Sequence, residues 1–240
     1  MALNPNFLQE VFLKNSFSLD EKQVSCFCKY AQLLVEWNQK MNLTAITDDE
    51  GIAYKHFVDS LVPLSLLGSD AFSGKHLIDV GTGAGFPGLP LKIACPEMEL
   101  TMVDSLKKRV GFLKEVCSQL SLQADVFHLR AEEAGHREEL RESFDYATAR
   151  AVAHLRELSE YCLPFVRVGG YFLAFKAGEI EQELDESRNA IGMLGGKVER
   201  IIPYEVPHTG RRTLLVIKKI SQTLPKYPRN PAKIAKTPLK

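Results

Sequence analysis

The chain has 240 residues, of which 45% are hydrophobic and 25% charged, and its 30 basic side chains balance its 30 acidic ones. This composition is typical of a globular protein with room for one large α/β domain and a smaller addition. It excludes a membrane-spanning protein, because no apolar run is long enough to cross a bilayer. The N-terminus also lacks the pattern of a signal peptide, so we expect a cytoplasmic protein with no membrane partner.

The first 67 residues have the pattern of a small helical region. Ser18 and Glu21 have the spacing of a capping box, which predicts a helix that runs to about Met41. The segment at 47–50, Thr-Asp-Asp-Glu, predicts a second helix that runs toward Leu61. Turn residues at 68–74 then separate this region from the rest. We therefore divide the chain into a helical region (1–67), an α/β domain (68–220) and a basic, proline-rich tail (221–240).

Short apolar segments alternate with helical ones after residue 74, which is the pattern of β-α-β units on a parallel sheet. We predict strands at 76–80, 100–104, 125–129, 144–149, 171–176, 198–206 and 213–218, with helices between the first six. The last two strands are too close in sequence for a crossover helix, so they should form an antiparallel hairpin. A mostly parallel seven-stranded, Rossmann-like sheet that ends in a hairpin resembles the class I S-adenosylmethionine-dependent methyltransferase fold.

The loop after the first predicted strand fits two glycine patterns. Gly83, Gly85 and Gly88 have the G-x-G-x-x-G spacing that binds a dinucleotide pyrophosphate at a helix N-terminus. Read from Asp79, the same loop places a carboxylate before the glycines. Asp104 ends the second strand, where a carboxylate can bind a ribose in either kind of site, so it does not discriminate between the two patterns.

Asp79 and Pro87 favour a ligand without phosphate. The carboxylate of Asp79 would repel a pyrophosphate but suits an ammonium group, although it could also only cap the turn. Pro87 removes one of the N–H groups that a phosphate would use. We interpret the loop as the binding site of a ligand that carries no phosphate.

Charge is unevenly distributed along the chain. From Val206 onward there are nine basic residues and no acidic residue, while residues 1–205 carry a net charge of −9. A basic end on an acidic body is typical of a polyanion-binding protein, and a solvated tail that aids solubility is the alternative. The prolines at 225, 228, 231 and 238 predict an extended tail without a helix, and Tyr227 could stack on bases, with no nearby carboxylate to neutralise the charges.

The five cysteines, Cys26, Cys28, Cys95, Cys117 and Cys162, include no C-x-x-C pair. They indicate buried thiols, with neither a disulfide framework nor a metal site.

Several segments together resemble one bacterial family, RsmG, also called GidB or glucose-inhibited division protein B. They are WNQKMNLTAITDDEGIAYKHFVDSL (37–61), LIDVGTGAGFPGLPLKI (77–93), MVDSLKKRVGFL (102–113), RAEE (130–133), ATARAVAHL (147–155) and KYPRNPAKIAKTPL (226–239). The resemblance implies S-adenosylmethionine as cofactor and methylation of guanine N7 in the 530 loop of 16S ribosomal RNA. The partner would be that RNA or a small-subunit particle, and we expect a monomer.

The resemblance also implies site residues. Gly81 and Phe86 would border the cofactor, Ala131 and Glu132 would flank its adenine, and Arg150 would line the site. With the residues of the loop, the expected cofactor set is Asp79, Gly81, Gly83, Gly85, Phe86, Asp104, Ala131, Glu132 and Arg150. The expected RNA contacts are His154, Lys176, Arg211, Lys226, Arg229 and Lys233, although His154 and Lys176 could equally be packing residues.

No classical catalytic residue is expected. Guanine N7 has an in-plane lone pair without a proton, so a methyltransferase can act on it by alignment alone. His56 and Asp59 share a helix face, where a structural contact is a better interpretation than a catalytic base. Two other classes remain open, an NAD-dependent oxidoreductase that uses the G-x-G-x-x-G spacing and an RNA-binding protein without enzymatic activity. Titration with S-adenosylmethionine or NAD distinguishes them.

Overall fold

The computed structural model describes residues 3–150 and 153–239, and its centre is a seven-stranded sheet in the order β3-β2-β1-β4-β5-β7-β6. The first five strands run parallel, and β7 is antiparallel to both β5 and β6. The bounds are β1 (His76–Val80), β2 (Glu99–Asp104), β3 (Asp125–His128), β4 (Phe144–Ala149), β5 (Val166–Ala177), β6 (Gly196–Val206) and β7 (Gly210–Lys219). The predicted fold, with its terminal hairpin, is confirmed.

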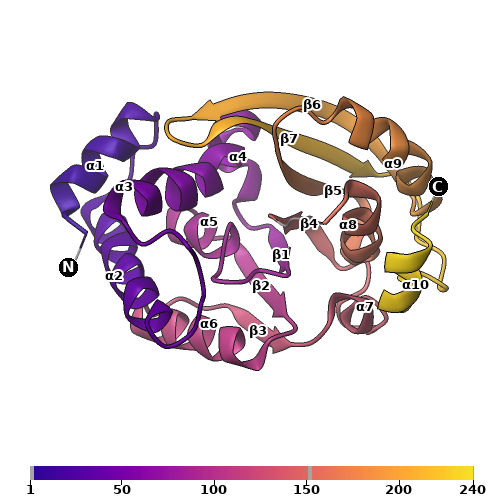
Figure 1. The fold of residues 1–240 in the computed structure, drawn as a ribbon, viewed down its shortest axis with the longest axis horizontal. Helices are drawn as coiled ribbons and strands as arrows, with labels where there is room; N and C mark the ends of the chain where they lie inside the picture. The colour runs from indigo at the N-terminus through magenta and orange to yellow at the C-terminus, as the bar shows by residue number, and fades with distance from the viewer. Residues whose placement is uncertain (1–2, 151–152, 240) are drawn as a thin grey trace.

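Helices cover both faces of the sheet (Figure 1). One face packs against α1 (Pro5–Lys14), α2 (Glu21–Asn38), η1 (Ile52–Val58), α4 (Asp59–Leu67), η2 (Ser69–Phe72), α5 (Gly88–Ala94) and α6 (Lys107–Gln119). The other packs against α7 (Ala131–Ala134), α8 (Leu155–Cys162), η3 (Leu163–Phe165) and α9 (Glu181–Met193). The short α3 (Asp49–Gly51) leads into η1, and α10 (Pro231–Lys236) lies at the opposite end of the long axis from α1 (Figure 1). No helix of the described residues is long and apolar enough to cross a membrane.

The alternation of side chains along β5 explains the two layers. Leu173 and Phe175 belong to the hydrophobic cluster on one face, and Phe172 and Ala174 belong to the cluster on the other. Successive residues of a strand point to opposite faces, so a strand that is apolar at every position is buried on both sides. β5 therefore requires helices on both faces of the sheet.

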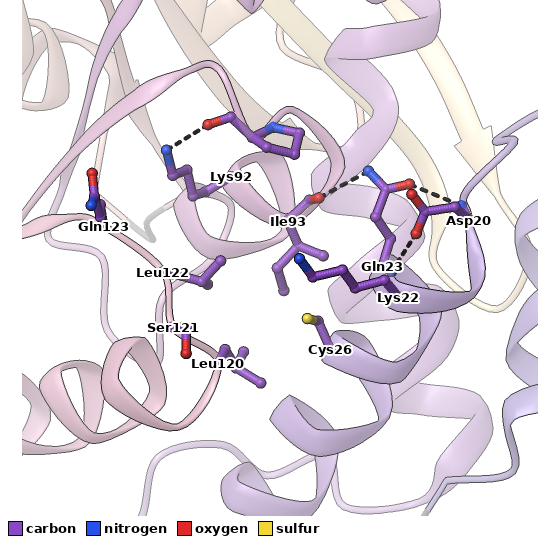
Figure 2. Close-up of a pocket in the computed structure, with 11 residues that line it drawn as sticks. Asp20, Lys22, Gln23, Cys26, Lys92, Ile93, Leu120, Ser121, Leu122 and Gln123 are labelled. Atoms are coloured by element: carbon purple, nitrogen blue, oxygen red, sulfur yellow. Dashed lines mark hydrogen bonds between the residues drawn. The ribbon is translucent and has the colours of Figure 1, made fainter.

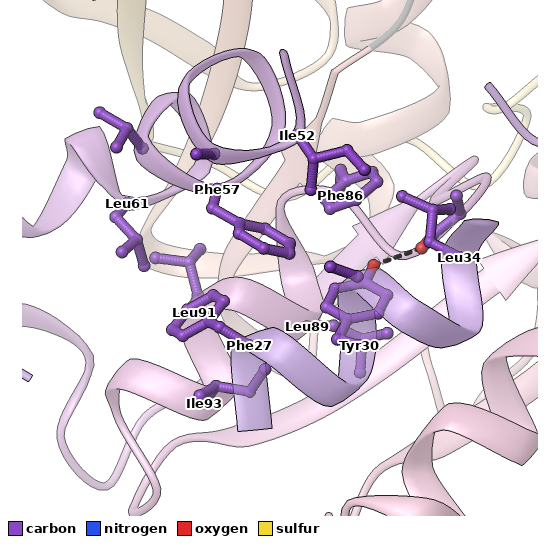
Figure 3. Close-up of a cluster of buried hydrophobic side chains, with 14 of the residues drawn as sticks. Phe27, Tyr30, Leu34, Ile52, Phe57, Leu61, Phe86, Leu89, Leu91 and Ile93 are labelled. Atoms are coloured by element: carbon purple, nitrogen blue, oxygen red, sulfur yellow. Dashed lines mark hydrogen bonds between the residues drawn. The ribbon is translucent and has the colours of Figure 1, made fainter. Parts of the chain in front are cut away.

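The helical N-terminal region packs directly on the glycine loop. Phe86, from this loop, stacks on Tyr30 of α2 with a ring separation of 5.3 Å, and Phe57 of η1 lies against both rings (Figure 3). The Tyr30 hydroxyl also donates a hydrogen bond to the carbonyl of Ala84. Aromatic contacts of this kind contribute about 1 kcal/mol each beyond the area that they bury. Side chains of the first 67 residues thus pack against the glycine loop and hold it in place.

Both predicted helix starts need correction. The cap of α2 is Asp20 rather than Ser18, because its Oδ1 accepts from the Gln23 N–H at 2.7 Å while Gln23 Oε1 accepts from the Asp20 N–H at 2.9 Å. This helix ends at Asn38. The next begins at Asp49 after an Asp48 cap and continues through a π-helical segment to Leu67. Both helices do begin with a capping side chain in the predicted segments, but the caps are Asp20 and Asp48.

The prediction of a helix-free tail is wrong. Pro231 opens α10, because the first turn of a helix does not need the N–H that proline lacks, and the Asn230 side chain accepts from the Lys233 N–H at 2.8 Å. Tyr227 is only 3% exposed, so it offers no stacking surface to RNA. The tail packs on the protein instead of extending from it.

Candidate functional site

A cavity of about 220 Å³ opens at the carboxyl ends of β1, β2 and β3. In an open α/β sheet this edge is the usual place for a ligand. Four of the expected cofactor residues line the cavity, namely Gly81, Asp104, Ala131 and Glu132. The rest of its lining is Val80, Val103, Ser105, Leu129, Arg130, Ala153, Leu158 and Tyr161.

The glycines of the loop differ in what surrounds them. Gly81 and Gly83 have positive φ angles of 66° and 62°, and a Cβ added to Gly81 would meet no atom within 4 Å. At Gly85 a Cβ would overlap Leu89, and at Gly88 it would lie 2.9 Å from Asp79 Oδ2. Gly85 and Gly88 are therefore required for packing, while Gly81 leaves open space beside the cavity.

Carboxylates occupy the N–H groups that a pyrophosphate would need. The Gly83 N–H donates to Asp104 Oδ2 at 2.9 Å, and the Gly88 N–H donates to Asp79 Oδ2, also at 2.9 Å. Thr82 Oγ1 donates to the same Asp79 oxygen at 2.6 Å. A phosphate placed here would lose these donors and approach two carboxylates. The loop does not fit a dinucleotide, and Asp79 caps the turn beneath the glycines.

Asp79 is completely buried, and its Oδ1 has no hydrogen-bond partner among the residues that the structure describes. Burial raises the pKa of this carboxyl to about 6, although the hydrogen bonds from Thr82 and Gly88 oppose the shift. The group is therefore mostly ionised at neutral pH. Its negative charge beneath the loop favours a cationic ligand over an anionic one.

One carboxylate oxygen of Glu132, which lines the cavity, accepts no hydrogen bond from the described residues. Glu132 Oε1 is buried and makes no hydrogen bond within residues 3–150 and 153–239, and Arg130 Nη1 lies at an ion-pair distance of 4.0 Å. A buried unpaired acceptor is costly unless a ligand or water donates to it. Together with the apolar side chains of Leu158 and Tyr161, this arrangement fits a nucleoside that has hydroxyl or amino donors and a planar base.

Phe86 and Arg150 lie outside this cavity. The Arg150 guanidinium lies 5.0 Å from the centre of the Phe86 ring, and its Nη1 donates to Asp59 Oδ2 at 2.9 Å. The Phe86 ring also stacks on His56, 4.4 Å away and nearly parallel, and Arg150 Nη2 lies 3.4 Å from His56 Nδ1. These two residues join the end of β4 to η1 and the glycine loop. Residues 151 and 152, within the segment at 147–155 that contributed to the resemblance, lie outside the described residues.

Asp59 is the centre of a buried ionic cluster. It is 0% exposed, its Oδ1 accepts from the Tyr204 hydroxyl at 3.0 Å, and Arg212 Nε lies 3.4 Å from the same oxygen. With Arg150, which follows β4, and Arg212 of β7, two cations thus share one carboxylate. The expectation of a structural contact for His56 and Asp59 is confirmed, whereas Tyr204 and Arg212 could not be found from the sequence.

Acid is expected to destabilise the protein through His56. Burial, and secondarily the Arg150 charge, lowers the pKa of His56 from 6.5 to about 3. Because the folded pKa is the lower one, the unfolded chain binds the proton first, and stability falls as the pH drops from 6.5 toward 3. Between pH 6.5 and 4.5 the free energy of unfolding should decrease by about 2 kcal/mol from this group.

Urea denaturation across this pH range measures the effect. His56→Gln should show a flatter pH dependence than the wild type, while His128→Gln, which changes an exposed histidine, should keep the wild-type slope. Equal slopes in the wild type and His56→Gln would contradict the linkage.

Two of the expected RNA contacts are held in buried ion pairs. Lys176 is 9% exposed, and its Nζ lies 2.6 Å from Glu183 Oε1 and donates to the Ala153 carbonyl at 3.0 Å. Arg229 binds Glu160, with 2.7 Å between Nη2 and Oε2. The expectation that no carboxylate neutralises the tail is therefore wrong, and both side chains are engaged within the protein.

The other expected RNA contacts are more accessible. Arg211 has a side chain that is 79% exposed, and Lys226 and Lys233 are exposed as well. The His154 side chain is 29% exposed and lies 3.2 Å from Glu186. These residues stay in the surface that we propose for RNA below.

A second cavity, of about 420 Å³, lies between α2, the end of α5 and the segment after α6 (Figure 2). Three of its polar side chains, Asp20, Gln23 and Lys92, already make hydrogen bonds with the helices and loops around it. Gln23 completes the cap of α2 and donates to the Ile93 carbonyl at 3.0 Å, and Lys92 donates to the Pro96 carbonyl at 2.8 Å. This cavity therefore carries no sign of a ligand, despite its larger volume.

A model of the family described as rRNA small subunit methyltransferase G, GidB, matches residues 23–213. Relatives named ribosomal RNA small subunit methyltransferase G align over nearly the whole chain. The relative from Alkaliphilus metalliredigens is 51% identical over 231 residues, 93% of this chain and 94% of its own length. The relative from Lactobacillus johnsonii is 48% identical over 240 residues, 99% of this chain and 100% of its own length.

Solved structures support the fold. The antibiotic-resistance methyltransferase Kmr matches with a TM-score of 0.51 at 20% identity, over 66% of this chain and 92% of its own. TrmN from Thermus thermophilus matches with a TM-score of 0.52, also at 20% identity, over 68% of this chain and 48% of its own. At such identities the likeness concerns the fold alone.

Proposed function

Because the chain belongs to the family of rRNA small subunit methyltransferase G, we propose that it methylates guanine N7 in the 530 loop of 16S ribosomal RNA with S-adenosylmethionine. The names of the relatives indicate RNA of the small ribosomal subunit as the substrate. The guanine base and its N7 atom come only from the resemblance of the sequence to this family. We expect it to act as a monomer in the cytoplasm, on the RNA or on a small-subunit particle.

The cavity beside the glycine loop is the observation that supports S-adenosylmethionine as the cofactor. There Gly81 leaves open space, Asp104 and Glu132 supply acceptors, and the loop N–H groups are already bound to carboxylates. This donor and acceptor pattern suits the hydroxyl and amino groups of an adenosine better than a phosphate. The buried charge of Asp79 suits a cationic ligand.

S-adenosylmethionine would supply an electrophilic methyl group when bound. Guanine N7 has no proton to lose, so the task of the chain is to hold the base in line and to exclude water. The apolar side chains of Leu158 and Tyr161 would shield the cavity from solvent, and no side chain has to act as a general base.

The proposed RNA surface consists of His154, Arg211, Lys226 and Lys233, to which neither Lys176 nor Arg229 contributes directly. Lysine and arginine side chains bind phosphates and release counterions, so affinity for RNA should depend on salt. Arg211 lies at the start of β7, beside the β6–β7 turn whose His208 packs on Tyr54 of η1, and the two lysines lie in the tail, so the RNA would have to contact two separate parts of the surface.

The first test is binding and transfer by the purified protein. Calorimetry should show binding of S-adenosylhomocysteine and none of NAD. Small-subunit particles from cells that lack the protein should gain one methyl group on the proposed guanine, as mapped by mass spectrometry of the RNA. Tight binding of NAD without binding of S-adenosylhomocysteine would refute the proposal, as would transfer to a different base.

A second arm of this experiment tests the RNA surface. Arg211→Ala/Lys226→Ala/Lys233→Ala should weaken RNA binding and lower its salt dependence by about three phosphate contacts at most, with S-adenosylhomocysteine affinity unchanged. Lys14→Ala/Lys22→Ala/Lys29→Ala removes the same charge from α1 and α2, which lie at the opposite end of the molecule from α10 (Figure 1), and should leave the salt dependence as it is. Equal salt slopes in both triple variants would mean that the tail lysines are merely solvated.

A further inference from the structure

Residues 223–239, here called the C-terminal strap, pack along α7 and α8 (Figure 1). Tyr227 and Leu239 are buried in the same hydrophobic cluster as Ala134 of α7 and Leu158 of α8. Ile234 of α10 is 0% exposed. The strap is therefore part of the folded core on this side of the sheet.

The beginning of the strap is fastened by Glu142 and Arg141. Glu142 Oε1 accepts from the Thr223 N–H at 2.7 Å. The Arg141 guanidinium donates to the carbonyl of Thr223 at 2.7 Å and to the carbonyls of Tyr227 and Gly135 at 2.8 Å. Since Gly135 directly follows α7, a single cation links the strap to the end of that helix.

Pro228 contacts the two residues that directly follow α7. Its carbonyl lies 2.7 Å from His136 Nε2, and a Cβ added to Gly135 would lie 2.9 Å from the Pro228 ring. With only four residues, α7 is too short to be stable on its own. Its position is set by its neighbours, among them the strap.

Arg229 fixes the strap to α8. Its backbone N–H and its Nε donate to Glu160 Oε1 at 2.9 and 2.8 Å, and its Nη2 donates to Oε2 at 2.7 Å. Glu160 is 0% exposed, and a buried carboxylate needs such a partner. The next residue, Tyr161, lines the cofactor cavity.

The two sides of α7 face two different spaces. Arg130 and Glu132 line the cofactor cavity, and they also line a space of about 410 Å³ between α7 and the strap residues 228–231. A displacement of the strap would therefore be transmitted to the wall that carries the unpaired oxygen of Glu132.

We propose that the C-terminal strap positions α7 and α8, and that it thereby sets the affinity of the cofactor cavity from behind its outer wall. This inference rests on the proposed function, because it assigns the cavity to S-adenosylmethionine. Arg229 and Pro228 are positioning residues in this arrangement, since neither of them lines the cofactor cavity.

Gly135→Ala tests the strap by adding one methyl group where the residue after α7 meets the Pro228 ring. Gly135 has ordinary helical angles, φ −67° and ψ −10°, so alanine suits the backbone; its Cβ would press mainly on the Pro228 ring, at 2.9 Å, and would lie 3.3 Å from the Ala131 carbonyl oxygen. We expect the Kd for S-adenosylhomocysteine and the KM for S-adenosylmethionine to rise about fivefold, with kcat at saturation within about twofold of the wild type. Gly111→Ala is the matched control, because its Cβ would meet no atom within 4 Å.

Arg229 gives a second, independent test. Arg229→Ala should raise the Kd for S-adenosylhomocysteine more than Gly135→Ala does, and Arg229→Lys should restore part of the affinity, because it keeps a cation beside Glu160. Thermal unfolding of each variant separates weaker binding from loss of fold. Wild-type affinity in folded Gly135→Ala and Arg229→Ala would overturn the strap alone. If the wild type itself did not bind S-adenosylhomocysteine, the proposed function would fail, and the strap would fail with it.

Discussion

Replacing Asp59 by alanine is expected to lower the free energy of unfolding by about 3–5 kcal/mol, because removal of one partner leaves buried charges without compensation. Asp59 is 0% exposed and serves both Arg150 and Arg212, whose side chains are only 15% and 22% exposed. The Tyr204 hydroxyl would lose its acceptor as well. Denaturation by urea at neutral pH measures the change.

The control is an ion pair at the surface. Asp185→Ala breaks the contact with Arg188, whose atoms lie 3.1 Å apart, but these side chains are 75% and 56% exposed. Solvent screening keeps such a pair below about 1 kcal/mol. A similar small loss for Asp59→Ala would mean that Arg150 and Arg212 reach solvent easily in the folded protein, and that the cluster does not hold η1 to the sheet.

The strands were predictable because their signal is local. The apolar runs are bounded by turn residues, and the segments at 76–80 and 144–149 coincide with β1 and β4. The predicted start of β5 was five residues late and that of β6 two residues late, since glycines and charged residues there interrupt the apolar pattern. Propensity describes these edges poorly when pairing with a neighbouring strand decides them.

The cofactor cavity was predictable in part. Gly81, Asp104, Ala131 and Glu132 follow strand ends or lie just beyond them, and parallel strands bring their carboxyl ends to one edge. Leu158 and Tyr161 gave no such signal, because they belong to α8 and reach the cavity only through the packing of that helix. Ser105 follows Asp104 directly, so its position beyond β2 was a signal that could have found it.

The tail illustrates what composition cannot show. Arg229 belongs to a run of basic residues, and its partner Glu160 lies 69 positions earlier on a helix across the fold. Lys176 and Glu183 are closer in sequence, at the end of β5 and in the first turn of α9, and they meet because the connection between these two elements is short. Net charge along a segment thus predicts neither burial nor pairing, and it cannot tell a binding residue from a structural one.

Replacing Asp104 by alanine is expected to raise the Kd for S-adenosylhomocysteine by at least about 30-fold, equivalent to about 2 kcal/mol. Asp104 is 3% exposed, its Oδ2 accepts from the Gly83 N–H at 2.9 Å, and its Oδ1 accepts from the Leu106 N–H at 2.8 Å. A hydrogen bond to a charged group contributes about 1.5–3 kcal/mol, so alanine would release the glycine loop as well as remove an acceptor from the cavity.

Asp104→Asn should recover only part of this affinity. Asparagine has only one acceptor oxygen, so its NH₂ group would face the N–H of either Gly83 or Leu106. Two donors would then face each other, and one of the two hydrogen bonds would be lost. Asp125→Ala, at an exposed position on the neighbouring β3, is the control and should bind as the wild type does. Calorimetry, with circular dichroism to verify the fold, decides the outcome. Normal binding by folded Asp104→Ala would mean that the cofactor does not occupy this cavity, because no ligand there could be indifferent to the loss of the carboxylate that fixes the loop.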